Sequence, residues 1–270
     1  MPKLAANFTM MFGEVAFLER FGAAARAGFE AVEYRTPYEI GVEELAAGLE
    51  EHRLRQVLLT TPSGDWGNGE RGFAAVAGRE HEFRSGLELA IVYARRLHCD
   101  AVHVMAGNAD KHDPATVERY VEHVRLAADA FAPLGIRALL EPINPIDMPG
   151  YFLHTTSQAK ALIERIDRPN VMLQLDLYHT QVAEGDLERK IRILLPLIAH
   201  VQIAGNPARH EPDVGEVNYV YLLGVLDAVG YSGWVGCEYQ PAGDTVGGLT
   251  WAAPYLTTTP RCGVTPPILE

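Results

Sequence analysis

Short apolar runs alternate with longer amphipathic segments along most of the chain. An apolar run of about four to six residues between turn residues is typical of a buried strand, and apolar residues three and four apart are typical of a helix. We predict strands at residues 4–7, 29–34, 56–59, 101–105, 138–141, 171–176, 200–202 and 234–238. We predict helices around residues 18–28, 42–52, 83–97, 117–131, 157–166, 186–195, 219–229 and 247–255.

Strands that alternate with helices predict a parallel sheet with helices packed outside it. The chain has 270 residues, close to the roughly 250 that are typical of a TIM barrel. An open doubly wound sheet with a phosphate-binding turn would carry GxGxxG after the first strand, and the sequence has none there. We therefore predict an α/β fold, a (β/α)8 TIM barrel, as a single domain over residues 1–255. Residues 256–270 hold three prolines and no periodicity, and we expect a loosely attached extension there.

Four consecutive predicted strands end in a side chain with an oxygen donor. These residues are Glu141, Asp176, Gln202 and Glu238. Catalytic groups of TIM barrels lie at the carboxyl ends of the strands. We therefore expect these four side chains to meet at one rim of the barrel.

Strand alternation predicts which neighbouring side chains face the barrel axis. If Glu238 faces inward, Gly236 and Trp234 do so as well, whereas Val235 and Cys237 pack against helices. Polar groups inside a barrel are unfavourable unless they are paired. Polar residues near the rim of successive strands therefore indicate a site.

Three carboxylates and one amide oxygen form a hard set of oxygen ligands, which suits Mg²⁺ or Mn²⁺ better than Zn²⁺. Without a cation, the clustered carboxylates would raise one another's pKa. For a single acid at a strand end, a helix cap or a salt bridge at the rim is the better explanation. Four at equivalent positions favour a divalent cation site made by Glu141, Asp176, Gln202 and Glu238.

A long irregular connection covers residues 60–78 and contains several glycines, Trp66 and Arg71. Connections of this length inside a compact domain are usually functional or disordered. An aromatic residue, acids and an arginine among glycines suggest a lid over a polar ligand. The alternative is a solvated surface loop.

Charge and composition narrow the class of partner. Lys and Arg total 23 against 35 Asp and Glu, so the formal net charge is −12. Nucleic-acid binding needs a basic surface, so we expect no nucleic-acid partner, although local arginines still permit a small anionic substrate.

The three cysteines include no CxxC pair, which predicts neither a disulfide framework nor a thiolate metal site. We expect a reducing cytoplasm, no membrane segment, and possible homo-oligomers.

Six separated motifs resemble the hydroxypyruvate isomerase family, which belongs to the xylose-isomerase-like TIM barrels. They lie at residues 7–12, 62–72, 141–144, 176–179, 202–204 and 236–239. The resemblance implies that Glu141 and Glu238 are the acid/base pair and that Asp176 and Gln202 complete a metal site. Ketose 3-epimerases carry a histidine at the third rim position, where this chain has Gln202.

The resemblance implies the interconversion of hydroxypyruvate and 2-hydroxy-3-oxopropanoate by metal-assisted proton transfer through a cis-enediolate. One glutamate would remove the proton and the other would return it, in an order that the sequence leaves open. The alternatives are a 2-oxo-tetronate isomerase, a ketose 3-epimerase, a catalytically silent sugar-acid binding protein and, more remotely, an endonuclease IV-like DNA-repair nuclease. The nuclease is suggested by the Asp-x-x-His element from Asp176 to His179.

The substrate carboxylate needs a cationic binding residue. Arg209 is the first candidate and Arg71 the second, because a guanidinium binds a carboxylate through two hydrogen bonds. Either arginine is equally compatible with a surface charge. His179 lies three residues after Asp176 and is expected to reach a substrate oxygen or to orient a ligand.

Four other polar residues are expected to have structural roles. His103 and His200 are predicted to be buried, hydrogen-bonded core residues, and Asp147 and Glu216 to be loop caps.

Overall fold

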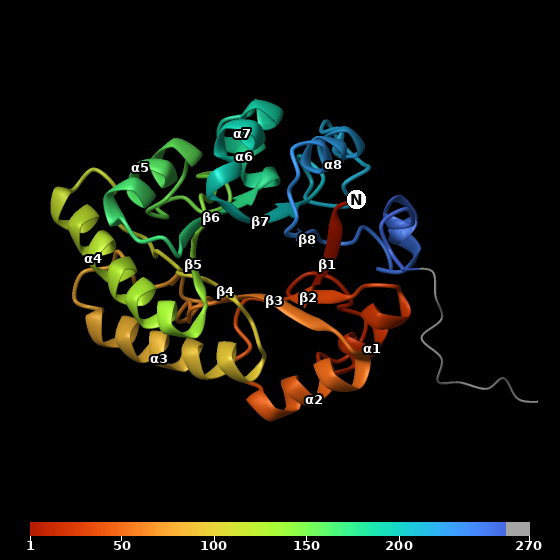
Figure 1. Ribbon diagram of the computed structural model, residues 1–270, viewed down its shortest axis with the longest axis horizontal. Coiled ribbons are helices and arrows are strands. Elements are labelled where there is room, and N and C mark those ends of the chain that lie inside the picture. Colours follow the sequence, from red (N-terminus) through yellow and green to blue (C-terminus); the bar gives the residue numbers. More distant parts are fainter. Residues whose placement is uncertain (258–270) are drawn as a thin grey trace, which may run out of the picture.

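The computed structural model describes residues 1–257. Its strands are β1 (Lys3–Asn7), β2 (Ala31–Glu33), β3 (Arg55–Thr60), β4 (Ala101–His103), β5 (Arg137–Leu140), β6 (Val171–Asp176), β7 (Ile198–Ile203) and β8 (Trp234–Cys237). Each strand pairs in parallel with the next, and β8 pairs with β1, so the sheet closes into a barrel (Figure 1). The predicted TIM barrel is confirmed. Most of the predicted extension, residues 258–270, lies outside the described residues.

Helices surround the barrel. They are α1 (Glu19–Arg26), α2 (Val42–His52), α3 (Glu80–Arg96), α4 (Pro114–Phe131), α5 (Thr156–Ile166), α6 (Leu177–Ala183), α7 (Leu187–Leu194) and α8 (Tyr219–Ala228). Short 3₁₀ helices are η1 (Ala132–Leu134), η2 (Leu195–Leu197) and η3 (Gly247–Ala252). No helix among residues 1–257 is long and apolar enough to cross a membrane.

Two helices follow β6, where the sequence predicted one. The additional helix, α6, begins directly after Asp176, whose side chain accepts hydrogen bonds from the backbone N–H groups of Tyr178 and His179. A side chain that satisfies the first free N–H groups stabilises a helix start. The short helix predicted after β8 is present as the 3₁₀ helix η3, which ends three residues before the predicted end.

The inward and outward faces of β8 follow the predicted alternation. Val235 and Cys237 belong to the main core between the barrel and its helices, whereas Trp234 packs on an apolar layer inside the barrel. Gly236 faces the interior, since a Cβ atom there would lie 2.3 Å from the carboxylate of Glu33. The close approach of Glu33 therefore requires glycine at position 236.

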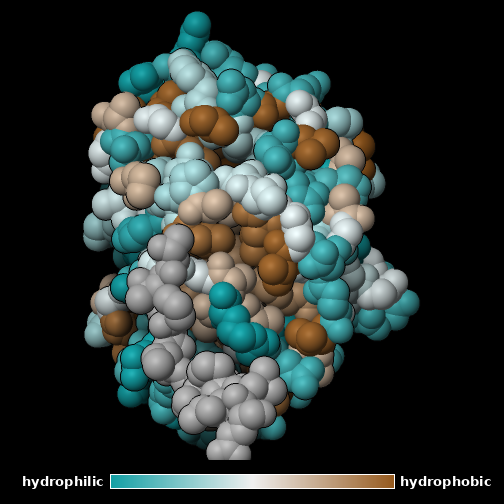
Figure 2. Space-filling model, turned by 90° about the vertical axis from the view of Figure 1, so that its right-hand side faces the viewer, coloured by the Kyte–Doolittle hydropathy of each residue, from teal (hydrophilic) through white to brown (hydrophobic). Residues whose placement is uncertain are grey.

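One side of the molecule carries a gathering of hydrophobic side chains in a hollow bordered by hydrophilic residues (Figure 2). A contiguous apolar patch is common at subunit interfaces. The homo-oligomer stays a prediction.

Candidate active site

A polar side chain lies at, or within one residue of, the carboxyl end of every strand in the barrel. They are Asn7, Glu33, Thr60, His103, Glu141, Asp176, Gln202 and Glu238. A cleft with about 480 Å³ of empty space, part of it open to solvent, lies at this rim and is lined by six of them. The sequence identified the last four members of the ring. By the same criterion Asn7 also closes its predicted strand, whereas the predicted strands 29–34, 56–59 and 101–105 do not end at Glu33, Thr60 and His103.

The predicted carboxylates come together. Glu141, Asp176 and Glu238 are buried, and with His179 they form a group whose potential ligand atoms all lie within 4.8 Å of one another. The three carboxylates come from the ends of β5, β6 and β8, and His179 comes from α6. The barrel closure therefore makes one cluster from residues far apart in the sequence.

The electrostatics of this cluster suit a cation. Burial raises the pKa of Glu141, and the nearby Asp176 raises it further. Burial also raises the pKa of Glu238, and Glu141 adds to that shift, although Arg209 opposes it. Among the described residues, Asp176 Oδ2 is buried without a hydrogen-bond partner. A bound cation would satisfy this oxygen and lower the repulsion between the carboxylates.

Gln202 lines the same cleft but also belongs to a network inside the barrel. Its Nε2 donates a hydrogen bond of 2.8 Å to Glu33, and its Oε1 accepts one of 2.6 Å from Gln174. These two contacts fix which end of the amide is oxygen. An amide oxygen has two lone pairs, so Oε1 keeps one for a cation.

Glu33 is the centre of this network, and the sequence reasoning missed it. Its buried carboxylate accepts hydrogen bonds from Asn7 at 2.8 Å and from Gln202 at 2.8 Å, and it lies 2.6 Å from Nε2 of His200. His200 is buried and hydrogen-bonded, as predicted. These hydrogen bonds inside the barrel hold the side chains of Asn7 and Gln202 in place at the rim.

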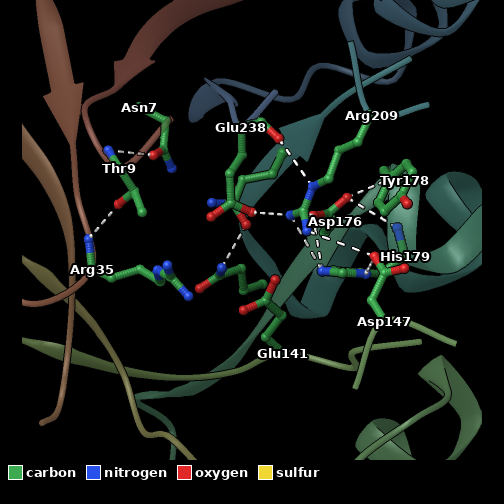
Figure 3. A network of polar contacts seen from close by, with 12 residues as sticks. Asn7, Thr9, Arg35, Glu141, Asp147, Asp176, Tyr178, His179, Arg209 and Glu238 are labelled. Carbon is green, nitrogen blue, oxygen red and sulfur yellow. Dashed lines mark hydrogen bonds and ion pairs between the residues drawn. The ribbon is translucent and has the colours of Figure 1, made fainter. Parts of the chain in front are cut away.

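Arg209 lies at the edge of the carboxylate cluster (Figure 3). Its Nη2 is 2.8 Å from a carboxylate oxygen of Glu238 and 3.7 Å from Asp176 Oδ2. Asp147, which was expected to be a loop cap, is 3.8 Å from the same guanidinium. Arg209, predicted to bind the substrate carboxylate, thus lies at the cleft with Glu238 as its main partner, and its role in substrate binding stays a prediction.

His179 is held in one tautomer by Asn144. The Asn144 oxygen accepts the backbone N–H groups of Ile146 and Asp147 at 3.0 and 2.9 Å, so its nitrogen is the atom that lies 2.7 Å from His179 Nδ1. This nitrogen can only donate, so Nδ1 accepts. Burial lowers the pKa of His179 well below its usual range, and a neutral imidazole carries its single proton on the other nitrogen. His179 Nε2 lies 3.7 Å from Asp176 Oδ2 and 3.4 Å from Nη2 of Arg209, which is itself a donor. The Asn144 contact at 2.7 Å is the shorter of the two donor contacts to the ring and places the proton on Nε2.

His103 differs from its predicted role. It is buried, but it lines the cleft, and its Nδ1 lies 3.1 Å from Glu141 Oε2. Burial lowers the pKa of His103 to about 3, so the ring is neutral. Its other nitrogen has no hydrogen-bond partner among residues 1–257.

The long loop after β3 reaches the site through Trp66, which lines the cleft. Arg71, the second predicted carboxylate-binding residue, does not line it. Its Nη1 donates to the backbone oxygens of Trp66 at 3.0 Å and Glu70 at 2.7 Å. Glu216 is also outside the cleft, and its carboxylate accepts a hydrogen bond of 3.3 Å from Gln181.

Known proteins resemble this chain over most of its length. A 2-oxo-tetronate isomerase of Cupriavidus necator is 48% identical over 95% of this chain and 99% of its own. The hydroxypyruvate isomerase of Escherichia coli is 43% identical over 94% of this chain and 100% of its own. A solved structure described as an AP endonuclease of family 2 from Brucella melitensis is 51% identical, with a TM-score of 0.93, over 95% of this chain and 100% of that one.

The isomerase relatives confirm the resemblance seen in the sequence motifs and the expectation of an isomerase. The model of the xylose isomerase-like TIM barrel family matches residues 21–255. Together with the closed eight-stranded barrel, this match shows that the chain belongs to the xylose isomerase-like TIM barrel family.

Proposed function

We propose that the protein interconverts hydroxypyruvate and 2-hydroxy-3-oxopropanoate, by moving a proton between adjacent carbons. The observation that carries this proposal is the presence of Glu141 and Glu238 in one buried cluster, with atoms within 4.8 Å of each other. Two carboxyl groups at one substrate can remove a proton from one carbon and return it to the next.

The environment of both glutamates suits proton transfer. A general acid or base works best when its pKa is near the working pH, and burial raises the pKa of Glu141 and of Glu238. His103 contacts Glu141 and would orient its carboxylate. The two glutamates differ in their partners, since Glu141 contacts His103 and Glu238 is paired with Arg209.

The proposed cofactor is Mg²⁺ or Mn²⁺, held by Glu141, Asp176, Gln202 and Glu238. Such a cation supplies Lewis-acid stabilisation of the negative charge that develops on the substrate oxygens. The donor set is oxygen only, and Asp176 Oδ2, which is buried without a hydrogen-bond partner in the part of the chain that the structure describes, supports the fit. His179 presents an N–H donor in the same cluster, which suits hydrogen bonding to a substrate oxygen rather than metal coordination.

A 2-oxo-tetronate is the second candidate substrate. The observation that favours it is the 48% identity with the C. necator protein of that name. The four-carbon acid undergoes the same proton shift and needs more room at the end away from the carboxylate. Comparing kcat/KM for the two acids would decide between them.

Deuterium exchange tests the proposal directly. We expect wild-type protein in D₂O with Mg²⁺ to incorporate deuterium at the hydroxypyruvate carbon that carries the hydroxyl group, as measured by NMR. Glu238→Gln should slow isomerisation by about 10²–10⁴-fold. Glu164→Gln, at an exposed position on α5, is the matched control and should behave as wild type. A wild-type protein that exchanges neither acid, with or without added metal, would contradict the proposed reaction.

The other sequence alternatives make different predictions. A DNA-repair nuclease, the class in which the B. melitensis structure is described, would bind and cleave abasic DNA. The net charge of −12 argues against a DNA partner. A silent binding protein would bind the acid without exchange, and a ketose 3-epimerase would act on neutral ketoses. A cytoplasmic location is likewise proposed from the sequence alone.

A further inference from the structure

Arg35 is a third arginine of the site, and the sequence reasoning did not select it. It lies two residues beyond the end of β2 and lines the cleft together with Glu141 and Glu238. Its backbone is fixed on both sides, because its N–H donates to Thr9 Oγ1 at 3.1 Å and its carbonyl accepts the N–H of Thr60 at 3.3 Å. The side chain extends from this anchored backbone toward the centre of the site (Figure 3).

The guanidinium of Arg35 differs from those of the two other candidate arginines. Arg209 is paired with Glu238 at 2.8 Å, and Arg71 donates to backbone oxygens of its own loop. Within residues 1–257, no hydrogen bond or ion pair occupies the guanidinium of Arg35; its contact is with the indole of Trp66, 4.0 Å from guanidinium carbon to ring centroid. Its N–H donors are therefore available to a ligand.

Trp66 is itself held in place by Arg71. The guanidinium carbon of Arg71 lies 3.8 Å from the centroid of the same indole, and its Nη1 donates to the backbone oxygen of Trp66 at 3.0 Å. A guanidinium that stacks on an aromatic ring keeps its edge free for a planar, two-point acceptor. A carboxylate is such an acceptor.

We propose that Arg35 binds the substrate carboxylate through paired hydrogen bonds, with Trp66 and Arg71 as positioning residues. The inference rests on the proposed function and names the part of the site that would select an acid over a neutral sugar. In this proposal Arg71 acts on the substrate only through Trp66, and Arg209 interacts with the carboxylate cluster instead of the substrate carboxylate. Because Arg35, Glu141 and Glu238 line one cleft, a short acid bound at Arg35 would place its other end toward the acid/base pair.

Steady-state kinetics test this assignment. In Arg35→Gln, we expect the KM for hydroxypyruvate to rise about 10- to 100-fold, as for the loss of hydrogen bonds to a charged group. Dihydroxyacetone replaces the carboxylate with a neutral hydroxymethyl group, and its kinetic constants should be unchanged. Arg189→Gln, on the exposed face of α7, is the control and should leave both substrates unaffected. An unchanged KM for hydroxypyruvate in a folded Arg35→Gln variant would overturn the proposal.

A binding measurement separates this inference from the proposed reaction. Saturation-transfer NMR measures binding and needs no turnover. It would compare the binding of 3-hydroxypropanoate with that of neutral 1,3-propanediol. We expect the acid to bind wild-type protein more tightly than the diol, and Arg35→Gln to lose that difference. Equal binding of the acid to both proteins, or no preference in the wild type, would overturn the role of Arg35 even if the enzyme is an active isomerase. If Arg35→Gln does not fold, Arg35→Lys keeps the charge without the two-point geometry and should show the same loss in weaker form.

The positioning role has its own readout. Trp66→Phe keeps an aromatic surface for Arg35 and should raise the KM for hydroxypyruvate less than Trp66→Ala does, with dihydroxyacetone unaffected by either. Equal effects of the two substitutions on both substrates would show that Trp66 only supports the fold of its loop.

Discussion

The side-chain nitrogen of Asn144 lies 2.7 Å from Nδ1 of His179, while its oxygen is occupied by two backbone N–H groups. This arrangement places the imidazole proton on Nε2, the atom that faces the carboxylate cluster. An outer residue thereby sets the chemical role of an inner one, as is common where histidines serve at polar sites.

Asn144→Asp should reverse that assignment. A carboxylate at this position still accepts the backbone N–H groups, but it favours the proton on Nδ1, so Nε2 loses its donor. We expect kcat to fall by about 10- to 100-fold, the usual effect of losing an outer partner, with thermal stability close to wild type. Nitrogen-15 NMR of the imidazole would report the tautomer. A neutral His179 imidazole that still carries its proton on Nε2 in this variant would contradict the assignment of the tautomer to Asn144.

Without the proposed cation, the stability of the protein should depend on pH. Burial raises the pKa of Glu141 and of Glu238 to about 8, above the value of about 4.3 for an unfolded glutamate. A carboxyl group with a raised folded-state pKa contributes stability at low pH, and this contribution is lost as pH rises through the folded-state pKa. The melting temperature of metal-free protein should therefore fall between about pH 5 and pH 8.

Mn²⁺ should counter this loss, because it binds the ionised carboxylates and competes with protons. Its affinity, measured by electron paramagnetic resonance, should increase as pH rises over the same window. Glu141→Gln should weaken binding and flatten the pH dependence. Affinity that is constant with pH in the wild type would argue against a site made by these glutamates.

Gly236→Ala should destabilise the barrel. The added Cβ would lie 2.3 Å from the buried Glu33 carboxylate, and overpacking of this kind typically lowers the free energy of unfolding by about 1–3 kcal/mol. The control is Gly224→Ala in α8, where nothing lies within 4 Å of the added atom and alanine should stabilise the helix by about 0.5–1 kcal/mol. Chemical denaturation would measure both. Similar changes in the two variants would show that Glu33 moves aside readily.

Glu33 and His200 should be energetically coupled. Their side chains are 2.6 Å apart and buried inside the barrel, so removal of either partner leaves the other unsatisfied. We expect Glu33→Gln and His200→Gln each to lower the free energy of unfolding, and the double variant to lose less than the sum. A coupling of about 0.5–3 kcal/mol is typical of residues in one network. Additive effects in this double-mutant cycle would contradict a direct interaction.

The sequence predicted the barrel because strand and helix periodicities alternate over the whole domain. It also predicted the rim cluster, because carboxylates follow apolar strands in a fixed order. Glu33 and His103 escaped selection because the predicted strands 29–34 and 101–105 continue past them, whereas β2 ends at Glu33 and β4 at His103. Apolar or aromatic residues follow both positions, so the sequence alone does not mark where these strands end.

The sequence by itself determined the fold and the set of acids that close β5, β6 and β8, since both follow from local patterns repeated along the chain. The tertiary structure alone decided which arginine has free N–H donors and which tautomer His179 adopts. It also decided that the Glu33 carboxylate packs against Gly236, where no side chain would fit. Each of these depends on contacts between segments that the barrel closure brings together, such as Trp66 with Arg35 and Asn144 with His179. Contacts of this kind have no periodic signature, because they are fixed by the packing of whole elements.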